Sequence, residues 1–152
     1  MKIDPKKNAY ARFLDDDAYT EVKKSKLIYL GCPYASNDYE IMASRYFGVT
    51  EVAKALTRAG FVVFSPITHA HPIQQRTGWS FWQHLDLPIL SICQLMIVYQ
   101  LEGWQQSVGL TAEIEFAGSL GIPILYLPTQ DALVVGEMLI EYDWKGDLRV
   151  RV

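Results

Sequence analysis

Short, unbroken runs of hydrophobic residues recur through the middle of the chain. They are rich in β-branched and aromatic residues and are bounded by turn-forming or polar residues, which is typical of β-strands. Strands buried on both faces lack the polar–apolar alternation of half-exposed strands, so these runs favour a parallel sheet. Four strands are predicted in this way, at residues 26–30, 61–64, 95–100 and 124–127.

The segments between these strands carry hydrophobic residues at helical spacing, with residues that start and end helices beside them. Asn37 or Asp38 can cap the first helix, and Gly60 ends it. Further helices are predicted at residues 79–93, 111–120 and 131–141. Pro88 predicts a break in the first of these three. Residues 67–80 are expected to form a loop long enough to act as a lid or a binding loop.

Strands and helices alternate along the chain, without repeats, low-complexity segments or a linker. This alternation predicts a three-layer α/β fold, flavodoxin- or Rossmann-like, around a parallel sheet of four or five strands. A single domain is expected to occupy residues 26–152. Residues 1–25 are charged and weakly patterned, so we expect a tail or a peripheral helix there.

Charge and composition argue against several classes of function. The 152 residues carry a net charge of −3, whereas nucleic-acid surfaces normally show a basic excess. No hydrophobic run approaches the ~18 residues of a membrane-spanning helix, and the N-terminus lacks the apolar core of a signal peptide. Cys32 and Cys93 lie in apolar surroundings and are expected to be buried thiols. The simplest expectation is a cytoplasmic protein without nucleic-acid or membrane partners.

The clearest candidate chemistry lies between the last two predicted strands. A polar loop with Ser107 and Gly109 leads there into a helix that has Glu113 in or near its first turn. A helix N-terminus favours an anion through its free N–H groups and macrodipole, and glycine lets a ligand approach the backbone. The same helix end is expected to keep Glu113 ionised. The alternative is a capped helix with an ordinary first-turn acid.

Asp86 is a second candidate acid, flanked by Leu85, Leu87 and Pro88. In this less polar setting its carboxyl group can hold a proton near neutral pH while Glu113 remains ionised. Two carboxyl groups divided in this way suit cleavage of a glycosidic bond through a cationic, oxocarbenium-like transition state. A helix cap or a surface acid is the alternative interpretation of Asp86.

Two histidines and three aromatic residues follow the second predicted strand. His69 and His71 could share a metal ion, but no third or fourth ligand stands beside them, so no metal site is expected. A contact between His69 and a ligand base, or a simple hydrogen bond, is favoured instead. Trp79, Phe81 and Trp82 could stack on a base, although residues at near-helical spacing more often belong to a core or an interface.

Three motifs, taken in order, resemble the nucleoside 2-deoxyribosyltransferase family. They are Ile28-Tyr29-Leu30-Gly31, Asp86 placed eight residues before Gln94, and Ser107-x-Gly109-x-x-x-Glu113-x-x-x-Ala117-x-x-x-Gly121-x-Pro123. The set spans roughly residues 26–128 and is most similar to the branch of 2′-deoxynucleoside 5′-monophosphate N-glycosidases. Val108 stands where the nucleoside-specific transferases carry an aspartate, which also favours the monophosphate branch.

The resemblance implies a role for each matching residue. Glu113 would attack the anomeric carbon of the sugar, Asp86 would protonate the departing base, and Tyr29 would orient Glu113. Ser107 would help to bind the 5′-phosphate, as suits a hydroxyl beside glycine-rich backbone at a helix start. The residues expected to bind substrate are Gly31, His69, Ser107 and Gly109.

The expected partner is therefore a small nucleotide or nucleoside, whose N-glycosidic bond the chain would hydrolyse or use for transfer. The resemblance and the high hydrophobic fraction together predict a homodimer or a larger homo-oligomer. No cofactor is expected, since the glycine-rich fingerprints of NAD and ATP sites are missing from the sequence. Two alternatives stay open: a non-catalytic nucleotide-binding or sensing module of the same fold, and a flavodoxin-like domain with an unrelated ligand.

Overall fold

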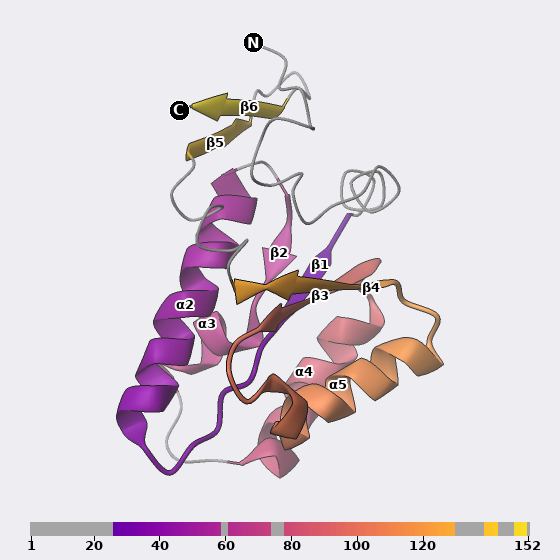
Figure 1. The fold of residues 1–152 in the computed structure, drawn as a ribbon. Coiled ribbons are helices and arrows are strands. Elements are labelled where there is room, and N and C mark those ends of the chain that lie inside the picture. Colours follow the sequence, from indigo (N-terminus) through magenta and orange to yellow (C-terminus); the bar gives the residue numbers. More distant parts are fainter. Residues whose placement is uncertain (1–25, 59–60, 74–77, 130–138, 143–147, 152) are drawn as a thin grey trace.

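In the computed structural model of the chain, helices pack against both faces of a central sheet (Figure 1). The structure describes residues 26–58, 61–73, 78–129, 139–142 and 148–151. Its strands are β1 (Ile28–Gly31), β2 (Val63–Phe64), β3 (Leu95–Gln100), β4 (Ile124–Pro128), β5 (Leu139–Tyr142) and β6 (Leu148–Arg151). Its helices are α2 (Tyr39–Arg58), α3 (Pro66–Ala70), α4 (Trp79–Ser91), the 3-10 helix η3 (Trp104–Gln106) and α5 (Val108–Ser119).

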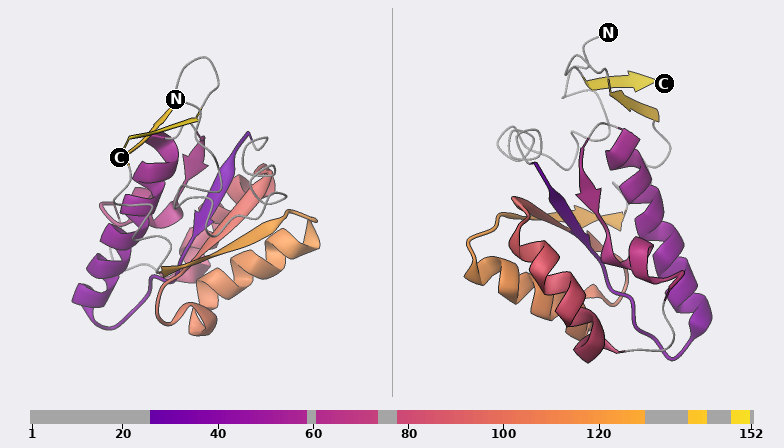
Figure 2. Two further views of the ribbon diagram at one scale, coloured as in Figure 1. Left: turned by 45° about the horizontal axis from the view of Figure 1, so that its top comes forward. Right: turned by 180° about the vertical axis from the view of Figure 1, so that it is seen from behind.

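The main sheet has the strand order β2-β1-β3-β4, and all of its strands run parallel. Ile28 of β1 pairs with Val63 on one side and with Leu95 on the other, so β1 and β3 are the central strands. α2 covers one face of the sheet, while α4 and α5 cover the other (Figures 1 and 2). The predicted three-layer α/β fold around a parallel sheet of four or five strands is thereby confirmed, and the sheet has four.

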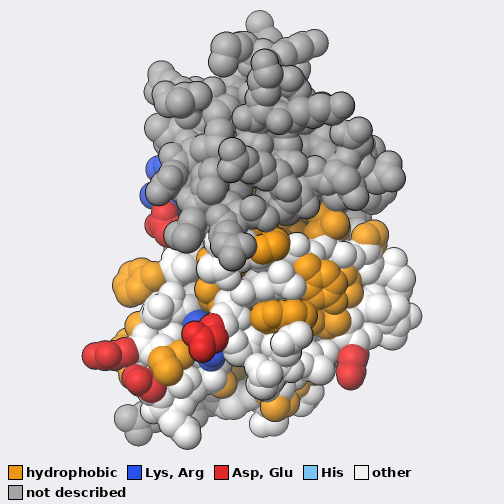
Figure 3. Space-filling model, viewed as in Figure 1, with side chains coloured by type: hydrophobic (Ala, Val, Ile, Leu, Met, Phe, Trp, Pro, Cys, Tyr) orange, Lys and Arg blue, Asp and Glu red, His pale blue; other side chains and the backbone are white. Residues whose placement is uncertain are grey.

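β4 is an edge strand of this sheet, and hydrophobic side chains gather around it on the face seen in Figure 3. Tyr126 of β4 is 43% exposed, and the centroid of its ring lies 5.6 Å from that of Trp104 in η3. Exposed hydrophobic edges often mark protein–protein contacts. This surface suits the expected homo-oligomer, which stays a prediction.

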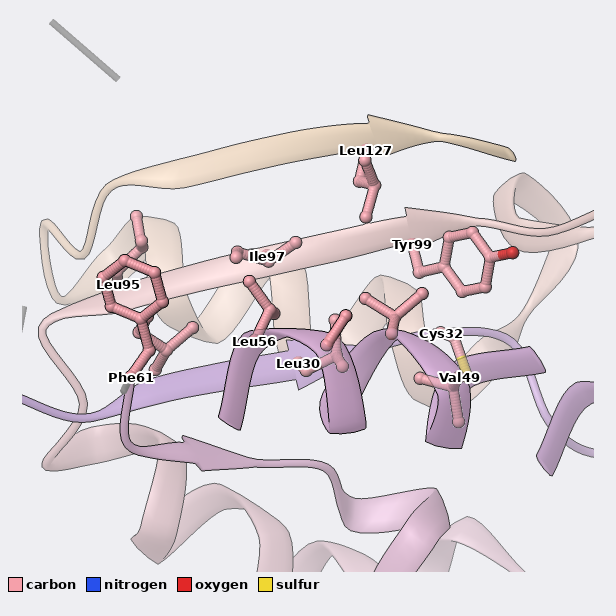
Figure 4. Close-up of a cluster of buried hydrophobic side chains, with 12 residues drawn as sticks. Leu30, Cys32, Val49, Leu56, Phe61, Leu95, Ile97, Tyr99 and Leu127 are labelled. Carbon is pink, nitrogen blue, oxygen red and sulfur yellow. The ribbon is translucent and has the colours of Figure 1, made fainter. Parts of the chain in front are cut away.

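Each face of the sheet carries its own hydrophobic cluster, because successive residues of a strand point to opposite sides. Leu30 of β1 points toward α2 and packs in one cluster with Val49 and Leu56 (Figure 4). Its neighbour Tyr29 belongs to the second cluster, together with Leu90 of α4. The alternation along β1 therefore places the Tyr29 side chain on the face covered by α4 and α5.

The segment after β2 contains a short helix where the sequence-based prediction has only a loop. α3 begins at Pro66, and Ser65 caps it by accepting a hydrogen bond from the Thr68 backbone N at 3.2 Å. A serine cap followed by proline in the first turn is a favourable helix start. The helix was missed because its five residues are too few to show a hydrophobic period.

Two other helices also depart from the prediction. α4 continues through Pro88 without the expected break. Asp86 and Leu90 are buried on either side of the proline, and this packing holds the turn together although proline removes one backbone hydrogen bond. α5 begins at Val108, three residues earlier than predicted, because Ser107 caps it.

The helix predicted at residues 131–141 is wrong at its C-terminal end. Residues 139–141 lie in β5, which pairs antiparallel with β6. The rest of that predicted helix, and the tail or peripheral helix expected at residues 1–25, lie outside the described residues. Among the helices that the structure describes, none combines the length and the apolar character needed to cross a membrane.

Candidate active site

A cavity of about 250 Å³ opens where β1, β2 and β3 end. Its walls are formed by the loop after β1, by α3, by α4 and by the start of α5. In open parallel sheets, ligands bind at this carboxyl edge of the strands. Four of the predicted site residues line the cavity: Asp86, Ser107, Gly109 and Glu113. The fold thus brings Asp86 of α4 beside the start of α5.

Glu113 reaches the cavity from the second turn of α5. Ser107 caps the helix through a hydrogen bond that its Oγ accepts from Leu110 N at 3.2 Å, so Val108 is the first helical residue. The first turn itself contains no acidic residue, so Glu113 lies near the first turn and not in it. The effect of the helix dipole fades beyond the first turn. Only 5% of the Glu113 surface is exposed, so burial governs its ionisation.

Burial raises the pKa of Glu113 from its ordinary value of 4.5 to about 8. The nearby Tyr29 hydroxyl lowers the pKa of Glu113, and the neighbouring Asp86 carboxyl raises it further. The expectation that the helix N-terminus keeps Glu113 ionised is therefore wrong for this cavity. At neutral pH the protonated acid predominates there.

Asp86 enters the same cavity from α4 and is also 5% exposed. Burial raises its pKa from 3.8 to about 6, in the direction expected from its apolar neighbours. Both carboxyl groups thus titrate near neutral pH. An ionised Asp86 carboxyl group also raises the pKa of Glu113, because it disfavours a second negative charge nearby.

Three buried polar atoms in this region lack a hydrogen-bond partner: Tyr29 Oη, Asp86 Oδ1 and Glu113 Oε2. The Tyr29 hydroxyl influences the Glu113 pKa, yet the two groups do not meet in good hydrogen-bond geometry. An unpartnered buried polar group costs about 1–3 kcal/mol, and native proteins contain few of them. Two of these atoms belong to residues that line the cavity, where a ligand can supply the missing partners.

Two glycines let side chains pack closely around the carboxyl group of Glu113 and the cavity wall. A Cβ added to Gly31 would lie 3.0 Å from Leu110 Cδ1 and 3.5 Å from Glu113 Oε2. A Cβ added to Gly109 would lie 3.1 Å from Cε3 of Trp79. Gly109 therefore lines the cavity as expected, whereas Gly31 lies beneath it against the candidate catalytic carboxyl.

The structure does not bring His69 to the cavity. His69 is exposed in α3, with its ring centroid 5.9 Å from that of Phe64, and it is not among the lining residues. Trp79 and Trp82 do line the cavity, whereas Phe81 is 57% exposed on the surface. In the part of the chain that the structure describes, no three His, Cys, Asp or Glu side chains are placed to hold a metal ion.

Sequence reasoning missed the individual residues by which the loop after β1 and α3 line the cavity. Tyr34 lines it, and its hydroxyl forms a hydrogen bond with Nδ1 of His71 at 2.6 Å. Pro66 and Ile67 of α3 add an apolar wall. An aromatic residue three positions after a central strand is the one signal that could have indicated Tyr34, because ligands bind where such strands end.

The parallel sheet and the helices on its two faces define a three-layer α/β protein. The structure is similar to that of a 2-deoxyribosyltransferase from the psychrotolerant bacterium Bacillus psychrosaccharolyticus. The TM-score is 0.52 and the sequence identity 19%, over 67% of this chain and 72% of that chain. The chain belongs to the family described as a domain of unknown function (DUF1937), which matches residues 26–128. None of the curated proteins matches the chain in sequence.

Proposed function

We propose that this protein cleaves the N-glycosidic bond of a nucleoside 5′-monophosphate or nucleoside, by hydrolysis or by transfer of the sugar. The observation that carries the proposal is the pair of buried, unpartnered carboxyl groups, Asp86 and Glu113, on the wall of one cavity. Retaining glycosidic cleavage needs such a pair, one group as nucleophile and the other as acid. The fold shared with a 2-deoxyribosyltransferase, described as a biocatalyst for nucleoside synthesis, supports the same class of reaction.

In the proposed reaction the Glu113 carboxylate attacks the anomeric carbon of the sugar while the bond to the base breaks. The electron pair of that bond leaves with the base, and the Asp86 carboxylic acid donates its proton to the base nitrogen. A glycosyl ester of Glu113 remains. Water then attacks the anomeric carbon, the ester bond to Glu113 breaks with its electron pair returning to the Glu113 carboxylate, and the proton of the water passes to the Asp86 carboxylate, which regenerates the enzyme. In transfer, a second base takes the place of water.

The reactive form needs Glu113 ionised and Asp86 protonated, whereas the pKa values of about 8 and about 6 place the first proton on Glu113. Substrate binding must therefore favour the other arrangement of the same proton. Burial and the two carboxyl groups raise the pKa of Tyr29 well above its usual value, so its hydroxyl remains a donor. Donation to the Glu113 carboxylate stabilises the reactive form. Tyr29→Phe is thus expected to lower kcat more than it raises KM in steady-state kinetics.

The start of α5 is the proposed site of the 5′-phosphate. Ser107, Val108 and Gly109 line the cavity there, at the N-terminus of a 12-residue helix whose first N–H groups suit an anion. Ser107 Oγ accepts a hydrogen bond from Leu110 N, and its own proton can still be donated to a phosphate oxygen. Ser107→Ala is expected to weaken binding of monophosphates more than binding of the parent nucleosides. An equal loss for both would reduce Ser107 to a helix cap.

The test of the reaction is incubation with a panel of nucleosides and nucleoside 5′-monophosphates, with free base followed by chromatography. Glu113→Gln keeps the shape of the side chain and removes its charge, so it should slow cleavage by at least ~10³-fold while binding survives. Glu115→Gln is the matched control, because Glu115 lies on the exposed side of the same helix. A Glu113→Gln variant with nearly wild-type activity would overturn the mechanism.

The second candidate function is a non-catalytic nucleotide-binding or sensing module. The raised pKa of Glu113 favours a binding function, because a protonated carboxyl group donates a hydrogen bond to a ligand and does not attack it. Binding of a nucleotide without release of base from any member of the panel would support this function. Calorimetric titration with the same panel measures that binding directly.

A further inference from the structure

The loop after β1 and the turn after β3 are tied together by one side chain, Arg45 of α2. Its Nη1 donates hydrogen bonds to the carbonyl oxygens of Tyr34 at 3.2 Å and Ala35 at 3.1 Å. Its Nη2 donates to the carbonyl oxygen of Glu102 at 3.0 Å. The guanidinium group, with donors in a rigid planar fork, thus bridges two backbone segments that are distant in the sequence.

Both segments lead directly into the walls of the cavity. Tyr34 and Ala35 line it themselves. In the other segment, η3 begins two residues after Glu102 and ends at Gln106. Gln106 and the next residue, Ser107, also line the cavity. Arg45 is not a lining residue, so it acts on the cavity through the backbone that it holds.

Gly103 shows independently that the backbone is shaped around Arg45. Its φ of +87° lies in the left-handed region that favours glycine. A Cβ at this position would lie 2.8 Å from Arg45 Nη2, so any side chain there would displace the guanidinium group. Gly121 has a similar φ of +70°, but no atom lies within 4 Å of an added Cβ. These two glycines therefore separate backbone strain from displacement of Arg45.

The loop after β1 is also held at a second point from the same helix. The Tyr34 hydroxyl is hydrogen-bonded to His71. The His71 ring stacks on that of Tyr46, with a centroid distance of 4.2 Å and an interplanar angle of 18°. Tyr46 is the neighbour of Arg45 on α2. A wall that is ordered before the ligand arrives spares the ligand the entropy of ordering it.

We propose that Arg45 is a positioning residue of the active site, which fixes the loop after β1 relative to the turn after β3 and so preorganises the cavity for its ligand. This inference rests on the proposed function. Arg45 does not contact the ligand, so its loss is felt in KM and not in the step that breaks the glycosidic bond.

Arg45→Lys tests the proposal, because a lysine keeps the charge but its compact ammonium group cannot reproduce the fork of donors. Loss of one or two charge-assisted hydrogen bonds is expected to raise KM by about 5- to 50-fold, with kcat within about threefold of wild type. Gly103→Ala should raise KM similarly, because it displaces the same group. Gly121→Ala is the control: it carries the same kind of backbone strain, so it should lower the Tm and leave KM unchanged.

Hydrogen–deuterium exchange provides a readout that needs no catalysis. In Arg45→Lys, residues 32–38 and 101–107 are both expected to exchange faster than in wild type, while the interior of α5 keeps its protection. Unchanged KM and unchanged exchange in both segments would overturn the inference, as would a fall in kcat at constant KM. A wild-type protein that releases no base from any nucleotide would refute the proposed function instead, and exchange would still decide whether Arg45 orders both segments.

Discussion

Glu113→Gln is expected to stabilise the protein at alkaline pH although it removes the proposed nucleophile. The pKa of Glu113 is about 8 in the folded protein, against an ordinary value of 4.5 that the unfolded chain restores. Between these pH values the folded state binds more protons than the unfolded state, so the free energy of unfolding falls as pH rises. The contribution of the Glu113 carboxyl group to the free energy of unfolding is fully present below pH 4.5 and is lost as the pH rises through about 8. The gap between the two pKa values corresponds to about 5 kcal/mol, an upper limit because water in the cavity would solvate the carboxylate.

The measurement is urea unfolding of wild type, Glu113→Gln and Glu115→Gln at about pH 5 and about pH 8.5. Taking the difference between variants removes the contribution of the titrating groups that Glu113 does not influence. Glu113→Gln should gain several kcal/mol over wild type at the higher pH and lie close to it at the lower pH, because its amide is never charged. Glu115→Gln, on the exposed side of the helix, should follow wild type at both. A difference for Glu113→Gln that does not grow with pH would refute the reasoning, since burial would then not be holding the proton.

Three further predictions concern the acid, the packing beneath it and the assembly. Asp86→Asn should harm substrates with poor leaving bases most, because good leaving groups need less help from an acid; comparison of kcat across the nucleotide panel measures this, and a uniform loss would contradict it. Gly31→Ala should destabilise the protein by about 1–3 kcal/mol in thermal unfolding, since its Cβ would crowd Leu110, whereas Gly118→Ala, with no atom within 4 Å of its Cβ, should not. Light scattering at micromolar concentration should show a dimer or larger assembly, and a monomer alone would count against it.

The strands could be predicted because their burial is nearly complete. The side chains of β1 are buried throughout, as are the first five residues of β3, so hydrophobicity alone marks both strands. α2 was also recognisable, because Asp38 and Gly60 bracket a long stretch of helical spacing. α3 was not, since a single turn of helix rests on one cap, Ser65, and on packing against its neighbours. The break predicted at Pro88 is also wrong because of tertiary packing: the packing of α4 against the core outweighs the local cost of proline in the helix.

The candidate carboxyl groups could be chosen from the sequence, but their ionisation could not. Asp86 and Glu113 stand out by residue type and by spacing from the strands that precede or follow them. Their pKa values depend on how deeply the packed chain buries each group and on the distance between them, and neither quantity is encoded locally. His69 and Tyr34 show the same limit for the cavity wall. The position of Tyr34 just after β1 is a weak local signal for the cavity wall, and nothing in the local sequence says that His69 faces solvent.

The sequence by itself determined the alternation of buried strands and helices, and hence the parallel three-layer fold, because a strand buried on both faces and an amphipathic helix each leave a hydrophobic pattern that survives in one dimension. It also determined which acids and which loop stand near the carboxyl edge of the sheet. Only the tertiary structure decided that Glu113 is buried deeply enough to hold a proton, and that Arg45 joins two distant loops around the cavity. Desolvation and long-range hydrogen bonds depend on distances between segments far apart in the chain, and these distances exist only once the chain has folded.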